Sequence, residues 1–302
     1  MRTRLLITGI LIALITCVAL PVDGRAEMTV SARNAILMDQ KTGNILFEKD
    51  ADEKRPIASI TKIMTAIVAI ESGMLEEQAT ASRKAVYTEG SSIYLEQGEK
   101  MTIKDLVYGL MLRSGNDAAV AISEHIGGSE EGFVYLMNEK ARWLGMTNTH
   151  FKNPHGLHEK GHYSTAHDMA ILMRYAMSNK LFRAVTAAKV YKAENRSYAW
   201  GNKNKLLTKY YDACVGGKTG YTKVAGRTLV SAAEKEGVKL IAVTLQASDD
   251  WNDHMAMYEK GFKEQQAAKR KSPTVFSHTG KLSTQELFTK AFQHLIGLNG
   301  LW

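Results

Sequence analysis

The sequence is poor in cysteine, and its two cysteines, Cys17 and Cys214, lie far apart. Cys17 falls in an amino-terminal segment that we expect to be removed, so the mature chain would contain one cysteine and no internal disulfide. Cys214 has no obvious cationic neighbour in the sequence beyond Lys218, which favours a small buried apolar residue over a reactive thiol. The body of the chain must therefore rely on a hydrophobic core, and its length of roughly 240 residues is sufficient for one.

The first 26 residues have the organisation of a secretory signal peptide. Arg2 and Arg4 precede an uncharged apolar run, and the small residues Gly24 and Ala26 follow it. We therefore predict an exported protein that is cut after Ala26 and acts at the extracytoplasmic face of the membrane or beyond it. Two alternatives remain open. The apolar run is just long enough for an uncleaved membrane anchor, and Cys17 could carry a lipid.

The charge of the chain gives no indication of a nucleic-acid partner. The net charge is +8, but most of the surplus lies in the first 26 residues and after residue 262, and the body between them is close to neutral. A basic carboxyl-terminal segment outside a cell could favour anionic membranes or polymers, although a solvated surface explains it equally well. The chain also contains no internal repeat and no low-complexity tract.

Apolar patterns along the body predict its fold class. Strands are expected at 35–39 and 44–48, joined by a turn at Gly43, and at 229–233 and 239–245. Helical spacing of apolar residues occurs at 60–68, 103–111, 117–126, 132–144, 165–177 and 253–262. This order predicts an α+β fold, in which both ends of the domain form an antiparallel sheet flanked by helices, with a helical lobe inserted.

Ser59 and Lys62 form the first candidate site for covalent chemistry. Residues three apart on a helix lie on one face, with Cβ atoms about 5–6 Å apart, so the hydroxyl and the amine can meet. Serine becomes a good nucleophile when a base takes its proton, and lysine is such a base only when it is neutral. The ordinary alternative is a helix cap followed by a surface lysine. Apolar neighbours such as Ile63 and Ile67 indicate that Lys62 is buried.

Two further short motifs could complete such a site. Ser114 and Asn116 open a predicted helix, and taken alone they would be an ordinary turn and helix cap. Lys218, Thr219 and Gly220 follow two glycines that would let a ligand or another chain approach the backbone closely. The lysine and the threonine could hold a carboxylate, and Gly220 leaves space for an incoming peptide.

In combination these motifs resemble the active-site set of penicillin-recognising serine enzymes. Serine-x-x-lysine and serine-x-asparagine each occur once, while a second lysine-threonine-glycine, at 41–43, precedes the serine and fits the first hairpin turn. The wider resemblance is carried by the segments 55–65, 112–119, 153–157 and 216–220. They are similar to low-molecular-mass penicillin-binding proteins, the serine-type D-alanyl-D-alanine carboxypeptidases (peptidase S11-like), and most resemble the sporulation-associated group of endospore-forming bacteria.

The resemblance implies an activity and a substrate. The enzyme would remove the terminal D-alanine from peptidoglycan stem peptides ending in D-Ala-D-Ala, through an acyl-enzyme, and β-lactam antibiotics would be covalent inhibitors. It assigns nucleophilic attack to Ser59, proton removal to Lys62 and proton relay to the leaving group to Ser114. No metal or organic cofactor is implied, and the expected location is the extracytoplasmic face of the membrane or the cell wall.

The resemblance also assigns residues that bind the substrate. Asn116 would orient Lys62 and the substrate amide, and Lys218 and Thr219 would hold the terminal carboxylate beside Gly220. The oxyanion would lie between the backbone N–H groups of the nucleophile and Tyr221. One departure concerns carboxylate binding, because similar proteins often carry an arginine after the last strand, and residues 248–254 contain none.

The chain is expected to divide into a signal peptide at 1–26, a penicillin-binding catalytic domain at 27–262 and a short basic tail at 263–302. Ser283 and Glu286 form a capping box in the tail, followed by apolar residues on one helical face up to Ile296. This helix could pack on the domain or on a dimer partner, or it could make peripheral contact with a membrane.

Three other functions compete with the carboxypeptidase. A class A β-lactamase would need a glutamate four residues before an asparagine, and no such pair occurs between Ser114 and Lys218. A metal hydrolase is suggested by histidines at 155–167, but their spacing matches no common metal motif. A wall-binding protein that has lost turnover would keep all three motifs.

Overall fold

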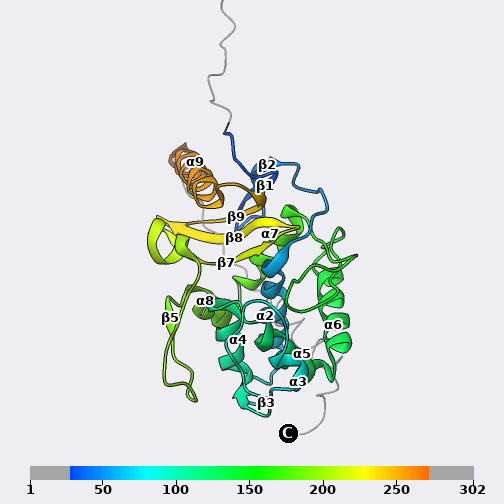
Figure 1. The fold of residues 1–302 in the computed structure, drawn as a ribbon. Coiled ribbons are helices and arrows are strands. Elements are labelled where there is room, and N and C mark those ends of the chain that lie inside the picture. The colour runs from blue at the N-terminus through cyan, green and yellow to red at the C-terminus, as the bar shows by residue number, and fades with distance from the viewer. Residues whose placement is uncertain (1–27, 272–302) are drawn as a thin grey trace, which may run out of the picture.

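The structure is a computed structural model that describes residues 28–271 (Figure 1). The predicted signal peptide and the predicted tail helix lie outside the described residues. Five antiparallel strands form the central sheet in the order β2-β1-β9-β8-β7. Their bounds are β1 Asn34–Asp39, β2 Ile45–Lys49, β7 Cys214–Thr222, β8 Gly226–Lys235 and β9 Val238–Ala247.

The two ends of the domain meet in the middle of the sheet. β1 pairs with β9 from Asn34 opposite Leu245 to Asp39 opposite Leu240. The antiparallel sheet predicted from both ends of the domain is therefore confirmed. β7 pairs on one side with β8 only, which leaves it as an edge strand of this sheet.

Alternation of side chains along β9 places the sheet between two apolar layers. Leu240 and Ala242 belong to the core shared with helix α9, whereas Ile241 and Val243 belong to the larger core shared with the helical lobe. Successive residues of a strand face opposite sides of a sheet, so a continuous apolar run is required when both sides are covered. Figure 1 shows α9 on one face of the sheet and the helical lobe on the other.

The inserted lobe is mainly helical, as the sequence predicts. The helices are η1 Ala58–Thr61, α2 Lys62–Glu71, α3 Arg83–Val86, α4 Ile103–Leu112, α5 Asn116–Gly127, α6 Glu130–Trp143, α7 Ala166–Ala176, α8 Lys180–Ala187, the π-helical turn η2 Leu206–Tyr210, and α9 Asp250–Lys271. Two small hairpins complete the structure: β3 Gln78–Thr80 with β4 Lys100–Thr102, and β5 Val190–Tyr191 with β6 Trp200–Gly201.

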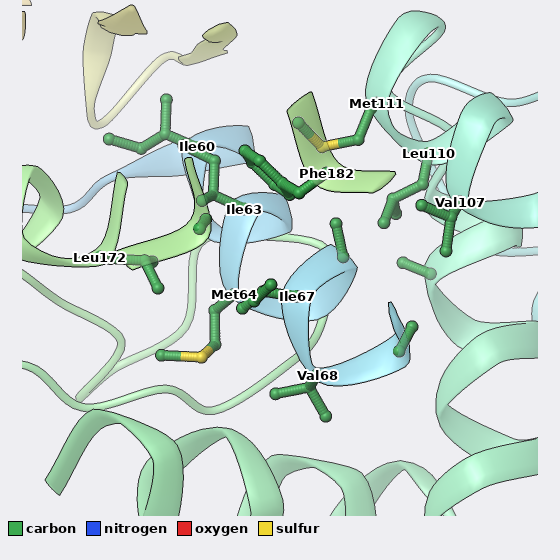
Figure 2. Packing of buried hydrophobic residues seen from close by; sticks show 14 of the residues in the cluster. Ile60, Ile63, Met64, Ile67, Val68, Val107, Leu110, Met111, Leu172 and Phe182 are labelled. Carbon is green, nitrogen blue, oxygen red and sulfur yellow. The ribbon is translucent and has the colours of Figure 1, made fainter. Parts of the chain in front are cut away.

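Helix α2 lies at the centre of the lobe, and all of its residues are buried. Figure 2 shows its apolar side chains pointing to several sides, toward α4, α7 and the aromatic ring of Phe182 on α8. A helix that is apolar all round belongs inside a protein, because no face of it is suited to water. Helix α2 therefore belongs to the core of the lobe, and Lys62 is its first residue.

The structure differs from the sequence-based expectation in several elements. β7, α8 and the two small hairpins were not predicted, and α9 continues past residue 262, where the catalytic domain was expected to end. None of the helices within the described residues is both long and apolar enough to cross a membrane.

Candidate active site

Ser59 lies in the turn η1 that leads into α2, directly before Lys62 begins the α-helix. The residue before it, Ala58, has φ of +50°, a left-handed conformation that is unfavourable for a residue with a side chain. A loop at 153–157 packs against this turn so closely that a Cβ atom on Gly156 would lie 2.0 Å from the carbonyl oxygen of Ala58. Only glycine fits there, and the tight contact fixes the turn that presents Ser59.

The amine of Lys62 is buried and surrounded by acceptors that carry no charge. Its Nζ atom lies 3.1 Å from Ser59 Oγ, 2.7 Å from Asn116 Oδ1 and 2.5 Å from the backbone oxygen of His155. Burial lowers the pKa of Lys62 well below its ordinary value, and the nearby cations Lys218 and Lys203 lower it further. The site therefore favours a neutral amine.

If the amine of Lys62 is neutral, its hydrogen bonds orient its lone pair toward Ser59. The amide oxygen of Asn116 and the carbonyl oxygen of His155 can only accept hydrogen bonds, so they take the two protons of a neutral Lys62. The remaining lone pair then faces Ser59 Oγ, which can donate its proton to it. This is the arrangement that a nucleophile and its general base require.

The junction between α4 and α5 contributes Ser114 and Asn116. Ser114 is buried with φ of +64°, another strained backbone position beside the site. Asn116 is oriented from its other end, because its Nδ2 atom donates to the backbone oxygen of Glu89 at 2.5 Å. The carboxylate of Asp117 accepts hydrogen bonds from the backbone of Ile93 and Leu95 and so holds the neighbouring loop against α5.

Strand β7 brings Lys218, Thr219 and Gly220 beside the nucleophile. A Cβ atom on Gly220 would lie 2.9 Å from the backbone nitrogen of Ser59, so glycine is what allows the strand to approach this close. Lys218 is buried and donates to the backbone oxygen of Thr219 at 2.8 Å. Burial and the charge of Lys203 lower the pKa of Lys218 to about 7. Tyr221 is exposed at the mouth of the site.

An open cavity of about 470 Å³ unites these elements. Five of the residues predicted from sequence line it: Ser59, Ser114, Thr219, Gly220 and Tyr221. The other three, Lys62, Asn116 and Lys218, are buried close by, and Lys62 is joined to Ser59 by its hydrogen bond. The structure therefore brings all eight predicted residues to one site.

Sequence reasoning missed several groups at this site. The backbone oxygen of His155 holds Lys62, but a main-chain contact has no side-chain signature. Lys203, Arg227 and Trp251 line the cavity and lie outside the three motifs. Among residues 28–271, no group of three or more histidine, cysteine, aspartate or glutamate side chains could hold a metal ion.

The fold and the site together have the features of serine enzymes that act through an acyl-enzyme. Comparison with known proteins makes this specific: the profile of peptidase S11, D-alanyl-D-alanine carboxypeptidase, matches residues 22–249. The chain belongs to this family.

Individual relatives agree with the family assignment. The chain is 41% identical over 236 residues to the D-alanyl-D-alanine carboxypeptidase DacF of Bacillus subtilis (strain 168), a match that covers 75% of this chain and 60% of DacF. It is 36% identical over 249 residues to DacC of Escherichia coli (strain K12), covering 78% of this chain and 62% of DacC. The chain thus spans about three fifths of the length of these two relatives.

Solved structures support the same fold. The crystal structure of a D-alanyl-D-alanine carboxypeptidase from Mycobacterium tuberculosis H37Rv has a TM-score of 0.74 at 30% identity, covering 79% of this chain and 95% of that protein. A variant of the Streptomyces K15 DD-transpeptidase also has a TM-score of 0.74, at 33% identity, covering 78% of this chain and all (100%) of that protein. The predicted α+β fold is confirmed.

Proposed function

We propose that this protein is a serine-type D-alanyl-D-alanine carboxypeptidase that removes the terminal D-alanine of peptidoglycan stem peptides. The observation that supports this most strongly is the buried amine of Lys62, held 3.1 Å from Ser59 Oγ by two uncharged acceptors. The family membership supports the same substrate, because the relatives' names specify D-alanyl-D-alanine.

In the proposed reaction, Ser59 Oγ attacks the carbonyl carbon between the two D-alanines while its proton passes to Lys62 Nζ. The C–N bond then breaks, and the departing D-alanine amine takes up a proton relayed by Ser114. The product on the protein is an ester of Ser59. Water hydrolyses this ester, with Lys62 again as the base, and restores the free hydroxyl.

The surrounding groups bind the substrate and the developing charge. Backbone N–H groups of Ser59 and Tyr221 would hold the oxyanion, and each such donor typically lowers the barrier by about 2.7–4 kcal/mol. Asn116 would orient the substrate amide, and Lys218 and Thr219 would contribute to binding its carboxylate. β-Lactams would acylate the same serine and block it.

The test is release of D-alanine from diacetyl-L-lysyl-D-alanyl-D-alanine by the parent protein and by Ser59→Ala. We expect release by the parent and none by the variant, and we expect labelled penicillin to attach at Ser59. Normal release by Ser59→Ala, or attachment of penicillin at another residue, contradicts the proposal. Penicillin labelling without any release by the parent would instead identify a wall-binding protein that has lost turnover.

The location and ends of the protein are a separate part of this proposal. Export through the signal peptide at 1–26 would place the catalytic domain where peptidoglycan lies, and the tail at 263–302 would contact the membrane surface. Liposome flotation of the full chain against a chain ending at residue 271 tests the tail. Equal flotation of both proteins rules the contact out. A role in sporulation stays a prediction from the resemblance.

A further inference from the structure

One wall of the cavity has no part in the reaction described so far. It is formed by Arg227 on β8 and by Asp250 and Trp251 at the start of α9. Arg227 lies directly opposite Tyr221 in the pairing of β7 with β8, and Thr219 lies opposite Leu229. Because side chains alternate along a strand, Arg227 shares a face of the sheet with Thr219 and is its diagonal neighbour, within reach of a long side chain.

The guanidinium of Arg227 is held in place from one side. Its Nε atom donates to Asp250 Oδ1 at 3.0 Å, and Nη2 donates to the same oxygen. Its Cζ atom lies 5.6 Å from the centre of the Trp251 ring, at the distance of a cation–π contact. Within residues 28–271, the Nη1 group of Arg227 donates no hydrogen bond, and 41% of the side chain is exposed. A positioned guanidinium therefore presents unused donors to the cavity.

The other basic groups around the cavity are less suited to binding an anion. Lys203 donates to Ser91 Oγ at 3.0 Å, and burial together with the charge of Arg113 lowers its pKa. Lys218 is buried and its pKa is lowered to about 7, so it is only partly charged at neutral pH. A guanidinium keeps its charge throughout the physiological range, and its planar donors match the two oxygens of a carboxylate.

We infer that Arg227 binds the carboxylate of the substrate's last residue and thereby selects peptides that end in a free carboxylate. The inference rests on the proposed function, in which one residue follows the bond that is cut. That carboxylate then lies about one residue length, ~3.5 Å, from the carbonyl that Ser59 attacks, inside the cavity that Arg227 lines. Asp250 and Trp251 are positioning residues for the guanidinium.

The test compares two peptides that differ only at this group: diacetyl-L-lysyl-D-alanyl-D-alanine and its carboxyl-terminal amide. Each peptide is given to the parent, to Arg227→Gln and to Lys223→Gln, and kcat/KM is measured. Lys223 is an exposed residue of the neighbouring turn outside the cavity, so its variant makes the same change in net charge. We expect the acid-to-amide ratio of kcat/KM to fall about 10- to 100-fold in Arg227→Gln, the loss of a charged hydrogen-bonded pair, and to stay unchanged in Lys223→Gln.

An unchanged ratio in Arg227→Gln overturns the inference and leaves Arg227 as an anchor of α9. Stoichiometric penicillin labelling of each variant shows that it is folded. Asp250→Asn provides a second variant, in which the guanidinium is present but loses its charged partner, and the ratio should fall by a smaller factor in the same direction.

Failure of the proposed function gives a different result. In that case the parent releases neither D-alanine from the acid nor D-alaninamide from the amide, and the rates of acylation by benzylpenicillin and by its methyl ester replace kcat/KM. A preference for the free acid that is lost in Arg227→Gln still supports the inference. A preference that the variant keeps, or the absence of any preference in the parent, overturns it.

Discussion

Helix α2 has a buried lysine site at each end, and the two sites are chemically opposite. At its start, Lys62 meets only uncharged acceptors. At its end, Glu71 forms a buried ion pair with Lys140 of α6, and Tyr175 donates to the same carboxylate at 2.7 Å. The side chains of both lysines are inaccessible to solvent.

The difference between these sites shows that burial alone does not decide the state of a lysine. Burial lowers the pKa of Lys140 only to about 8, because the negative charge of Glu71 and its hydrogen bond to the amine oppose the shift. Burial lowers the pKa of Lys62 well below its ordinary value, and the cations Lys218 and Lys203 lower it further; the charge of Asp117 opposes this shift, but no carboxylate is hydrogen-bonded to the amine. The Lys140 site is suited to a structural cation and the Lys62 site to a base.

Replacing each lysine by methionine should separate these roles most clearly. In Lys62→Met we expect acylation by penicillin to fall about 10³-fold, because the general base is lost, while the urea midpoint of unfolding does not fall. Rates of labelled penicillin attachment and equilibrium unfolding measure the two effects. Acylation within tenfold of the parent would contradict the role of Lys62.

Lys140→Met should show the reverse pattern. It leaves the carboxylate of Glu71 buried without its cation, so we expect the free energy of unfolding to fall by about 3–5 kcal/mol, with normal acylation by the folded fraction. The double variant Glu71→Leu/Lys140→Met removes both charges and should recover most of the loss. A double variant as unstable as the single one would show that the pair is not the cause.

Asn116→Asp should make the Lys62 site resemble the Lys140 site. A carboxylate 2.7 Å from Lys62 Nζ stabilises the charged amine and raises its pKa, so acylation at pH 7 should fall about 10- to 100-fold. In a plot of the acylation rate against pH, the rising limb should move to higher pH. Asn116→Ser, which removes the acceptor without adding charge, should not move the limb upward. Identical limbs in the two variants would refute this electrostatic explanation.

The smallest effect is expected from Lys218→Gln. The charge of Lys218 disfavours protonation of Lys62, so its removal should raise the pKa of Lys62. The rising limb of acylation, normalised to its own plateau, should then move to higher pH by up to about one unit. A limb that stays in place or moves to lower pH would show that Lys218 does not act on Lys62 through its charge.

Much of the fold could be predicted because its signals are local. The helix predicted at 103–111 is observed at Ile103–Leu112, and the strand predicted at 239–245 lies within Val238–Ala247. Strand β7 was missed because it contains Gly216 and Gly217, which lack the β-branched side chains of a typical strand. Its place in the sheet comes from pairing with β8, a tertiary contact that no local pattern contains.

The same distinction applies to the site. The proximity of Ser59 and Lys62 could be predicted from spacing, because one helical turn joins them. Of the other acceptors for Lys62, Asn116 was assigned through the resemblance, whereas the backbone oxygen of His155 comes from a distant loop that meets Lys62 only in the folded protein. Arg227 escaped notice because a basic residue was sought after the last strand, whereas it lies on β8 and the segment after β9 supplies Asp250 to hold it.

The pairing of β1 with β9 also has a consequence for synthesis. Because β1 needs a partner about two hundred residues further along the chain, the sheet has a high contact order and its closure must be slow. A growing polypeptide can form the helices of the lobe early, but β7 and β9 leave the ribosome only after the lobe that precedes them. Until they arrive, Ser59 has no strand beside it, so an unfinished chain would have no reactive centre.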